Sequence, residues 1–225
     1  MRDEADISLV RHSTAEVVAD TLMRLIVSGE LASGVPLREQ RLAARLGISR
    51  NTLREGFRLL EQSRLVRYEM HRGAVVSTPS TAEFADLTRT RRHLELLAVQ
   101  QIPTATELDR IELALAELAA AAVSRDPGTI VAKDLALHQT IVDLLRSERL
   151  STFFTQIRKE LVFAFTVISL TDREYARPEE TVLTQHRDIV DAIRDGRTHD
   201  AAALLAAHID ESLARVQEIL ESDET

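Results

Sequence analysis

Length and composition limit the kinds of protein that this chain can be. It has 225 residues, 44% of them hydrophobic, so it can bury the core of one large domain or of two small ones. The sequence has no cysteine, which excludes disulfide bonds and thiolate metal sites. Residues 1–10 lack the long apolar run of a signal peptide or membrane span, so we expect a soluble, cytoplasmic protein without a membrane partner.

The net charge of -8 is unevenly distributed along the chain. Residues 38–72 carry nine Arg against four Glu, a local net charge of +5. Residues 79–225 carry 16 Lys and Arg against 26 Asp and Glu, a local net charge of -10. An acidic chain repels nucleic acid as a whole, so the basic segment indicates one surface that is built to meet an anion.

The first predicted elements are three helices. Only 4% of the residues are aromatic, and Gly and Pro are few, which favours helices over a β-sandwich or barrel. The first helix is predicted to begin at the capping box STAE (13–16) and to end at Gly29. A second helix is predicted over about 38–46, after which Gly47 breaks the chain and Ser49 caps a third helix. Two short helices around a glycine turn are typical of a helix-turn-helix.

A hairpin and a domain boundary are predicted next. The run LVRYEMHRGAVVS contains two β-prone segments around a polar tip at 69–73. The following run STPST contains a proline, and Ser80 with Glu83 forms another capping box. We therefore expect a winged helix-turn-helix domain in residues 1–78 and a second domain in residues 79–225.

The second domain is predicted to be an antiparallel bundle of helices without strands. Proline and glycine signals mark the breaks between its elements. About six helices are expected, over residues 81–101, 104–124, 128–146, 149–171, 178–195 and 198–221. The predicted fold class is mainly α, an N-terminal winged helix-turn-helix followed by a C-terminal helical bundle.

Three arginines of the third predicted helix share one face. Arg50, Arg54 and Arg58 lie four residues apart, while Leu53 and Phe57 face the core. A helix fits the major groove of B-DNA, where Arg can bond guanine in a fork, so we expect double-stranded DNA as a partner. The alternative is a solvated helix face whose arginines pair with nearby glutamates. The preceding helix and the following hairpin favour DNA.

The run LREQRLAARLGISRNTLREGFRLLEQSRLV, followed by RGAVV, resembles the DNA-binding domain of GntR-type bacterial transcription regulators over about 65 residues. That resemblance implies contacts to bases or phosphates from the recognition helix and the wing tip. The implied DNA-binding residues are Arg38, Gln40, Ser49, Arg50, Asn51, Thr52, Arg54, Arg58, His71, Arg72 and Gly73. The chain departs from the family at Gln40, where Arg is common, at Gly56, where Ala is usual, and at Arg64, where Gly commonly ends the helix.

Four polar residues interrupt predicted apolar helix faces in the second domain. Asp134 and His138 lie one turn apart on one helix, and His186 and His208 lie on the next-to-last and last helices. A polar residue on a buried face needs a partner, and a single histidine there is more often a hydrogen-bonded core residue than a ligand. Together, one carboxylate and three imidazoles suit a divalent ion such as Zn, Ni, Co, Fe or Mn.

The segments DLALH, QHRDIVDAI and HI resemble the FCD ligand-binding domain of the FadR subfamily of GntR regulators, and six helices resemble its VanR-type branch. That resemblance implies that the same four residues hold one divalent metal ion, with Zn or Ni as the first choices. It also implies a small-molecule effector, commonly a carboxylate that completes the coordination of the metal, and a pocket lined by Arg91. An ion pair of Arg91 with Glu95 at i+4 is the alternative, and both interpretations stay open at this point.

These observations predict a ligand-responsive transcription regulator and not an enzyme. A homodimer would place two recognition helices on the half-sites of an inverted repeat, about one DNA turn or ~34 Å apart. The effector would shift the balance between DNA-competent and DNA-incompetent geometries. A metal-dependent enzyme is an alternative, although neither ExxH nor HExxH occurs in the sequence. A purely structural metal is a further alternative.

Overall fold

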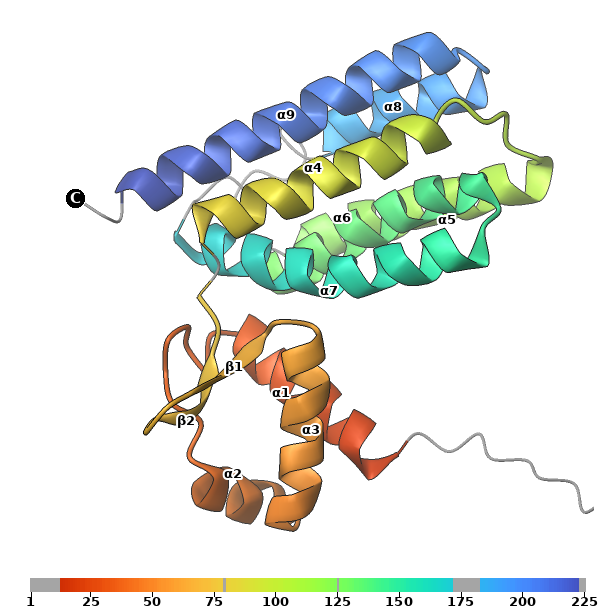
Figure 1. Cartoon of the computed structure of the whole chain (residues 1–225). Coiled ribbons are helices and arrows are strands. Elements are labelled where there is room, and N and C mark those ends of the chain that lie inside the picture. The colour runs from red at the N-terminus through yellow and green to blue at the C-terminus, as the bar shows by residue number, and fades with distance from the viewer. Residues whose placement is uncertain (1–12, 79, 125, 172–182, 223–225) are drawn as a thin grey trace, which may run out of the picture. The chain divides into compact units, whose positions relative to one another are not determined.

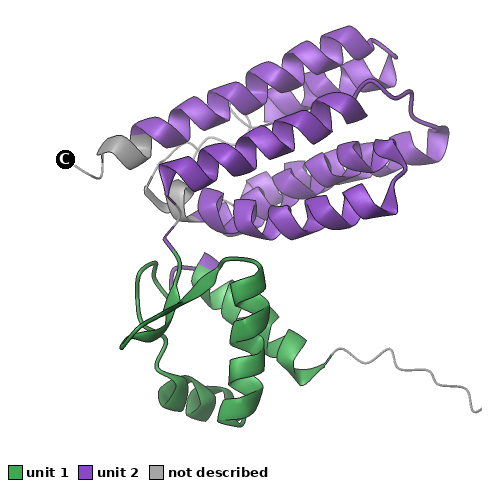
Figure 2. Ribbon diagram, in the orientation of Figure 1, with its two compact units in different colours: residues 1–26, 30–77 green, residues 27–29, 78–225 purple. Residues whose placement is uncertain are grey.

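The structure is a computed structural model that describes residues 13–78, 80–124, 126–171 and 183–222. The chain divides into two compact units, one of residues 1–26 and 30–77 and the other of residues 27–29 and 78–225 (Figure 2). The domain boundary that we proposed after residue 78 lies one residue from this division.

The first unit consists of three helices and a two-stranded hairpin (Figure 1). Its elements are α1 (Thr14–Val27), α2 (Glu39–Leu46), α3 (Arg50–Gln62), β1 (Val66–Glu69) and β2 (Gly73–Val76). The two strands are antiparallel, with Val66 opposite Val76 and Glu69 opposite Gly73. Side chains from α1 and α3 close the core of this unit, where Leu22, Leu53 and Phe57 are fully buried. The predicted helix-turn-helix and hairpin are confirmed.

Local sequence signals fix the ends of these helices. At the start of α1, the Ser13 amide donates to Glu16 Oε2 at 2.7 Å and the Glu16 amide donates to Ser13 Oγ at 3.2 Å, the reciprocal pair of a capping box. Gly47 adopts φ +65° after α2, which a residue with a side chain rarely does. Ser49 Oγ then accepts a hydrogen bond from the Thr52 amide at 3.1 Å and starts α3.

The end of α3 has a Schellman motif with an arginine at its left-handed position. Arg64 adopts φ +53°, its amide donates to Glu61 O at 3.0 Å, and the Leu65 amide donates to Leu60 O at 2.9 Å. A non-glycine residue in this conformation costs about 1 kcal/mol. The departure from the family at this position therefore keeps the shape of the turn and costs some stability.

The second unit is built from helices (Figure 1). They are α4 (Thr81–Ala98), α5 (Ala105–Ser124), α6 (Pro127–Val142), the 3₁₀ turn η1 (Asp143–Leu145), α7 (Glu148–Thr171), α8 (Thr184–Arg194) and α9 (Thr198–Ser222). The predicted capping box of Ser80 and Glu83 is present at the start of α4. The predicted fold class, mainly α with a winged helix-turn-helix and a helical bundle, is confirmed.

Two predicted helices of the second unit end earlier in the structure than expected. The helix predicted over 81–101 ends at Ala98, and the helix predicted over 128–146 ends at Val142 and continues as η1. Arg146 adopts φ +51° after η1, so the regular helix cannot continue there. Of the helix predicted over 178–195, residues 178–182 lie outside the described residues.

The helices of the second unit pack so that four of them meet around one polar cluster. Helix α9 packs against α4 and α8, and α6 packs against α4, α5 and α7. Apolar side chains of α5, α6, α8 and α9 form the largest buried cluster, which includes Leu118, Ile141, Val190 and Leu205. The buried polar residues of this cluster lie on α4 (Arg91 and Glu95), α6 (Asp134 and His138), α8 (His186) and α9 (His208). In the part of the chain that the structure describes, no helix combines the length and hydropathy of a membrane span.

Candidate nucleic-acid interface and candidate metal centre

The first unit presents the predicted arginine row on an exposed face of α3. Arg50 and Arg54 have side-chain exposures of 61% and 50%, and both pair with Glu39 at the start of α2. Arg54 Nε donates to both carboxylate oxygens at 3.1 and 3.0 Å, and Arg50 Nη2 donates to one of them at 3.3 Å. Hydrogen bonding to Arg54 is the main cause that lowers the pKa of Glu39, so this carboxylate is ionised at neutral pH.

The remaining predicted contacts of α3 are also on its surface. Arg58 is exposed and pairs with Glu55 on the same helix at 2.7 Å. Asn51 is exposed and Thr52 half-buried at the first turn, where a recognition helix meets base edges. Sequence reasoning missed the pairing of Glu39 with Arg50 and Arg54, because Glu39 lies on another helix.

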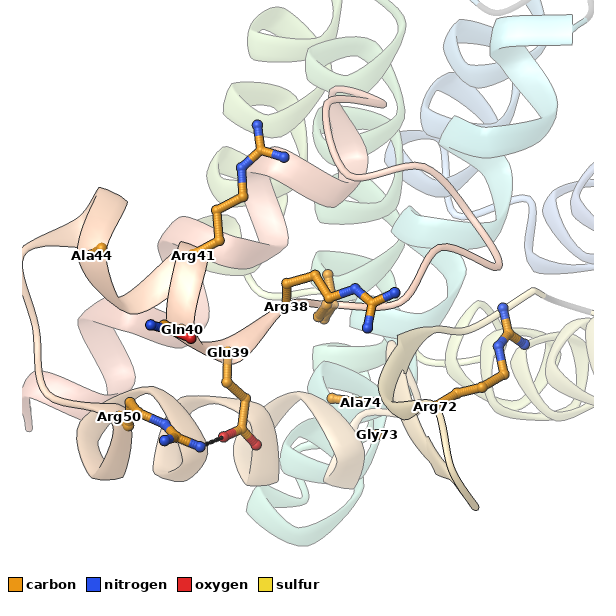
Figure 3. Close-up of a pocket in the computed structure, with 10 residues that line it drawn as sticks. Arg38, Glu39, Gln40, Arg41, Ala44, Arg50, Arg72, Gly73 and Ala74 are labelled. Atoms are coloured by element: carbon orange, nitrogen blue, oxygen red, sulfur yellow. Dashed lines mark hydrogen bonds and ion pairs between the residues drawn. The ribbon is translucent and has the colours of Figure 1, made fainter.

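The start of α2, the start of α3 and the wing border one groove of about 670 Å³ (Figure 3). Its lining includes four arginines, Arg38, Arg41, Arg50 and Arg72. Arg72 Nη2 donates to the Gly34 carbonyl oxygen at 3.0 Å. Residues of the predicted DNA-binding set from three elements, among them Gln40 and Gly73, are thus brought to one basic surface.

The second unit brings the four predicted metal ligands together. Asp134, His138, His186 and His208 are all buried, and each offers one ligand atom within 4.8 Å of the others. His186 Nε2 lies 2.8 Å from Asp134 Oδ1 and 3.2 Å from His138 Nε2. Two ligand atoms that share one ion at about 2.0 to 2.2 Å lie roughly 3 Å apart when they subtend a right angle. The donor set and these distances fit a single divalent ion.

A second residue holds His138 in place. His138 Nδ1 lies 2.6 Å from Glu95 Oε2, and the other oxygen of Glu95 accepts from Arg91 Nε at 2.7 Å. A carboxylate partner makes Nδ1 the protonated nitrogen of the imidazole, so the lone pair of Nε2 is available to bind a metal ion. Sequence reasoning considered Glu95 only as a partner of Arg91, since nothing in the sequence indicates which face of α4 meets α6.

His208 is held by a comparable relay. Its Nδ1 lies 2.8 Å from Gln185 Oε1, and Gln185 Nε2 donates to Glu211 Oε2 at 2.7 Å. The carboxylate of Glu211 fixes which end of the Gln185 amide faces the histidine, because only the amide nitrogen can donate to it. His208 therefore also carries its proton on Nδ1. Gln185 is a further functional residue that sequence reasoning missed.

The electrostatics at Asp134, His138 and His208 favour the protonation states that a metal requires. Burial raises the pKa of the Asp134 carboxyl, but His186, His138 and Arg91 together lower it below the ordinary value. Burial is the first cause that lowers the pKa of His138 and of His208, and nearby positive charges add to it. A carboxylate and neutral imidazoles are the forms that bind a divalent ion.

Arg91 forms the expected ion pair, and one of its nitrogens is left without a hydrogen-bond partner among the described residues. Arg91 is 1% exposed and makes the ion pair with Glu95, as the i+4 spacing predicted. Within the described residues, Arg91 Nη2 has no hydrogen-bond partner, and the same holds for Thr88 Oγ1 on the same helix. An unpaired guanidinium nitrogen in a protein interior is costly, so it marks a place where an anion would be stabilised.

A winged helix-turn-helix with a basic surface, joined to a helical domain with a buried Asp/His cluster, is the architecture of a ligand-responsive DNA-binding regulator. The family of bacterial regulatory proteins described as the gntR family matches residues 14–76, and the FCD domain matches residues 86–211. The chain therefore belongs to the GntR family and carries an FCD domain, as the resemblance in its sequence predicted.

Curated relatives match mainly through the N-terminal part of this chain. The gluconate operon transcriptional repressor of Bacillus licheniformis is 33% identical over 97 residues, which cover 43% of this chain and 40% of that protein. The Glc operon transcriptional activator of Escherichia coli K12 is 46% identical over 61 residues, which cover 27% of this chain and 22% of that protein. In both cases the match spans less than half of the relative's length.

Solved structures match over nearly the whole chain. A GntR-type crystal structure from Rhodococcus sp. RHA1 has a TM-score of 0.82 and 28% identity, and the match covers 92% of this chain and 99% of the other. Escherichia coli McbR/YncC has a TM-score of 0.76 at 18% identity over 92% of this chain and 99% of the other, a likeness of fold alone.

Proposed function

We propose that this chain is a bacterial transcription regulator that binds an operator through α3 and the wing and responds to a small carboxylate bound in its second unit. The observation that carries this proposal is the shared basic surface of α2, α3 and the wing. Exposed guanidiniums at the start of a recognition helix can bond guanine in a fork, and those around the groove can neutralise phosphates. The names of the relatives, transcriptional repressors and activators, agree with this function.

The proposed operator is an inverted repeat that is bound by a homodimer. One recognition helix reads only a few base pairs, and two related by a twofold axis read two half-sites about one turn apart. Base contacts are proposed for the residues at the start of α3, namely Ser49 at the N-cap, Arg50, Asn51, Thr52 and Arg54. Arg38, Gln40, Arg58, His71, Arg72 and Gly73 are proposed to contact phosphates or the minor groove.

The proposed cofactor is one divalent metal ion, Zn or Ni in the first place, held by Asp134, His138, His186 and His208. Three nitrogen donors and one oxygen donor suit these borderline ions. A bound ion would supply a positive charge and open coordination positions to which a carboxylate can bind. The free Nη2 of Arg91 supports a carboxylate effector, because a guanidinium nitrogen pairs well with such an oxygen.

Selection of bound duplexes from a random DNA pool tests this function. The wild-type protein should enrich an inverted repeat, and Arg50→Ala/Arg54→Ala should lose this enrichment, because the contacts that distinguish the bases are removed. Arg194→Ala/Arg197→Ala is the matched control, because it removes the same charge from exposed positions of the second unit. Enrichment of the same sequence by all three proteins, or by none of them with and without added metal and acetate, would contradict the proposal.

A further inference from the structure

Three buried side chains form a continuous relay beside the proposed metal ligands. Arg91 Nε lies 2.7 Å from one oxygen of Glu95, and the other oxygen lies 2.6 Å from His138 Nδ1. The side chains of Glu95 and His138 are fully buried, and that of Arg91 is 1% exposed. Each oxygen of the Glu95 carboxylate therefore has one partner, Arg91 on α4 and His138 on α6.

Few charged residues are buried in the interior of the second unit. Among the described residues, the charged residues with a relative exposure of 8% or less are Arg91, Glu95 and Asp134. A divalent ion binds imidazoles in their neutral form, so the ion and these three side chains together would carry a net charge of +1. A singly charged anion would then neutralise the interior of the second unit.

Glu95 favours the binding of a metal ion and disfavours the binding of an anion. Its charge attracts a metal ion and its hydrogen bond keeps the lone pair of His138 Nε2 pointed at that ion, so it favours the metal. The same charge repels an anion and partly neutralises Arg91, whose Nη2 is the nitrogen without a partner in the described structure.

We propose that Glu95 is a positioning residue of the metal centre that also sets the charge of the ligand which the centre accepts, a single carboxylate. This inference rests on the proposed metal centre. It goes beyond that centre because Glu95 is not one of the four proposed metal ligands. We assign to Glu95 an increase in the affinity for the metal ion and a decrease in the affinity for the carboxylate.

The test uses the full-length protein, Co²⁺ as the metal and acetate as the anion. The visible absorption of bound Co²⁺ gives its dissociation constant, and the change of that spectrum on addition of acetate gives the dissociation constant of acetate. In Glu95→Gln, Co²⁺ should bind about 10 to 100 times more weakly. Acetate should bind to the Co²⁺-loaded variant at least about ten times more tightly, because a buried like charge has been removed.

Two further variants separate the roles of Glu95. In Glu95→Asp the charge stays but the side chain is too short to reach both donors, so Co²⁺ should bind more weakly and the affinity for acetate should change less than about twofold. This variant tests the proposal even if Glu95→Gln does not fold. Gln185→Ala is the matched control on the other relay, and it should weaken Co²⁺ without strengthening acetate.

The results distinguish this inference from the proposed function. Failure of the wild-type protein to bind Co²⁺ would remove the metal centre itself. If the wild-type protein binds Co²⁺ but Glu95→Gln weakens both ligands, or Glu95→Asp strengthens acetate as Gln does, the role of Glu95 is overturned while the metal centre stands.

Discussion

Glu39 is the residue that connects the two helices of the proposed DNA interface. Its carboxylate holds Arg50 and Arg54 in the free protein. In Glu39→Gln the negative charge is lost, so binding to any DNA should become tighter because phosphates are no longer repelled. The arginines lose their fixed positions, so the ratio of operator to random-DNA affinity should fall about tenfold, within the ~1 to 3 kcal/mol of one bidentate base contact. Titrations of both DNAs at one salt concentration measure this ratio.

Glu55→Gln is the control for this prediction. It removes the same charge from the same surface, but Glu55 pairs with Arg58 and not with the two arginines at the first turns of α3. This variant should bind all DNA more tightly and keep its preference for the operator. Equal loss of preference in both variants would mean that charge alone, and not the position of Arg50 and Arg54, decides specificity.

The packing of α1 on α3 depends on the absence of a side chain at Gly56. A Cβ atom at this position would lie 2.7 Å from Val18 Cγ1 and 3.2 Å from Val18 Cβ. Gly56→Ala should therefore lower the free energy of unfolding by about 1 to 3 kcal/mol, although Ala is the better helix former by about 1 kcal/mol. Hydrogen exchange of the α1 and α3 amides measures the change within the first unit.

A second substitution, at Val18, should remove the steric clash that Gly56→Ala introduces. Val18→Ala removes the Cγ1 atom that a Cβ at position 56 would meet. The double variant Val18→Ala/Gly56→Ala should therefore lose at least about 1 kcal/mol less free energy of unfolding than the two single variants lose in sum. Additive effects of the two changes would show that the helices move apart and that Gly56 has no packing role.

Elements with local signals could be predicted from the sequence. The capping boxes at Ser13 and Ser80 and the glycine turn at Gly47 each fix a helix end through residues that are neighbours in the chain. The end of α6 could not be predicted, because the apolar pattern continues through η1 and only the backbone of Arg146 turns left-handed. The end of α3 at Gln62 was predicted from the change of sequence pattern that follows it, although the left-handed residue there is Arg64 and not a glycine.

The four proposed metal ligands could be predicted from the sequence, but the residues that hold them in place could not. Asp134 and His138 share one turn of a helix and interrupt an apolar face, and His186 and His208 interrupt two others. Glu95 and Gln185 could not be assigned to these histidines, because they lie 43 and 23 residues away on other helices. A sequence period gives the face of a helix but not the neighbour that this face meets.

Removal of the metal should affect the whole molecule. A ligand that binds only the folded chain at a thousand times its dissociation constant stabilises it by about 4 kcal/mol. For a chain of this size that corresponds to about 8 to 16 °C in Tm. Thermal scans of the Zn- or Ni-loaded and the chelated protein measure this shift. His208→Ala should abolish it, and His199→Ala, an exposed position on the same helix, should leave it intact.

The same scans separate a structural metal from one that binds the effector. If the ion only ties α6, α8 and α9 together, acetate has no partner in the loaded protein and should leave Tm and operator affinity unchanged. If the ion and Arg91 bind a carboxylate together, acetate should raise the Tm of the loaded protein more than that of the chelated protein. Operator affinity should then change by about 5- to 150-fold at saturating effector, the range of a coupling free energy of about 1 to 3 kcal/mol. A Tm shift without a change in operator affinity would mean that the centre binds carboxylates but is not coupled to DNA binding.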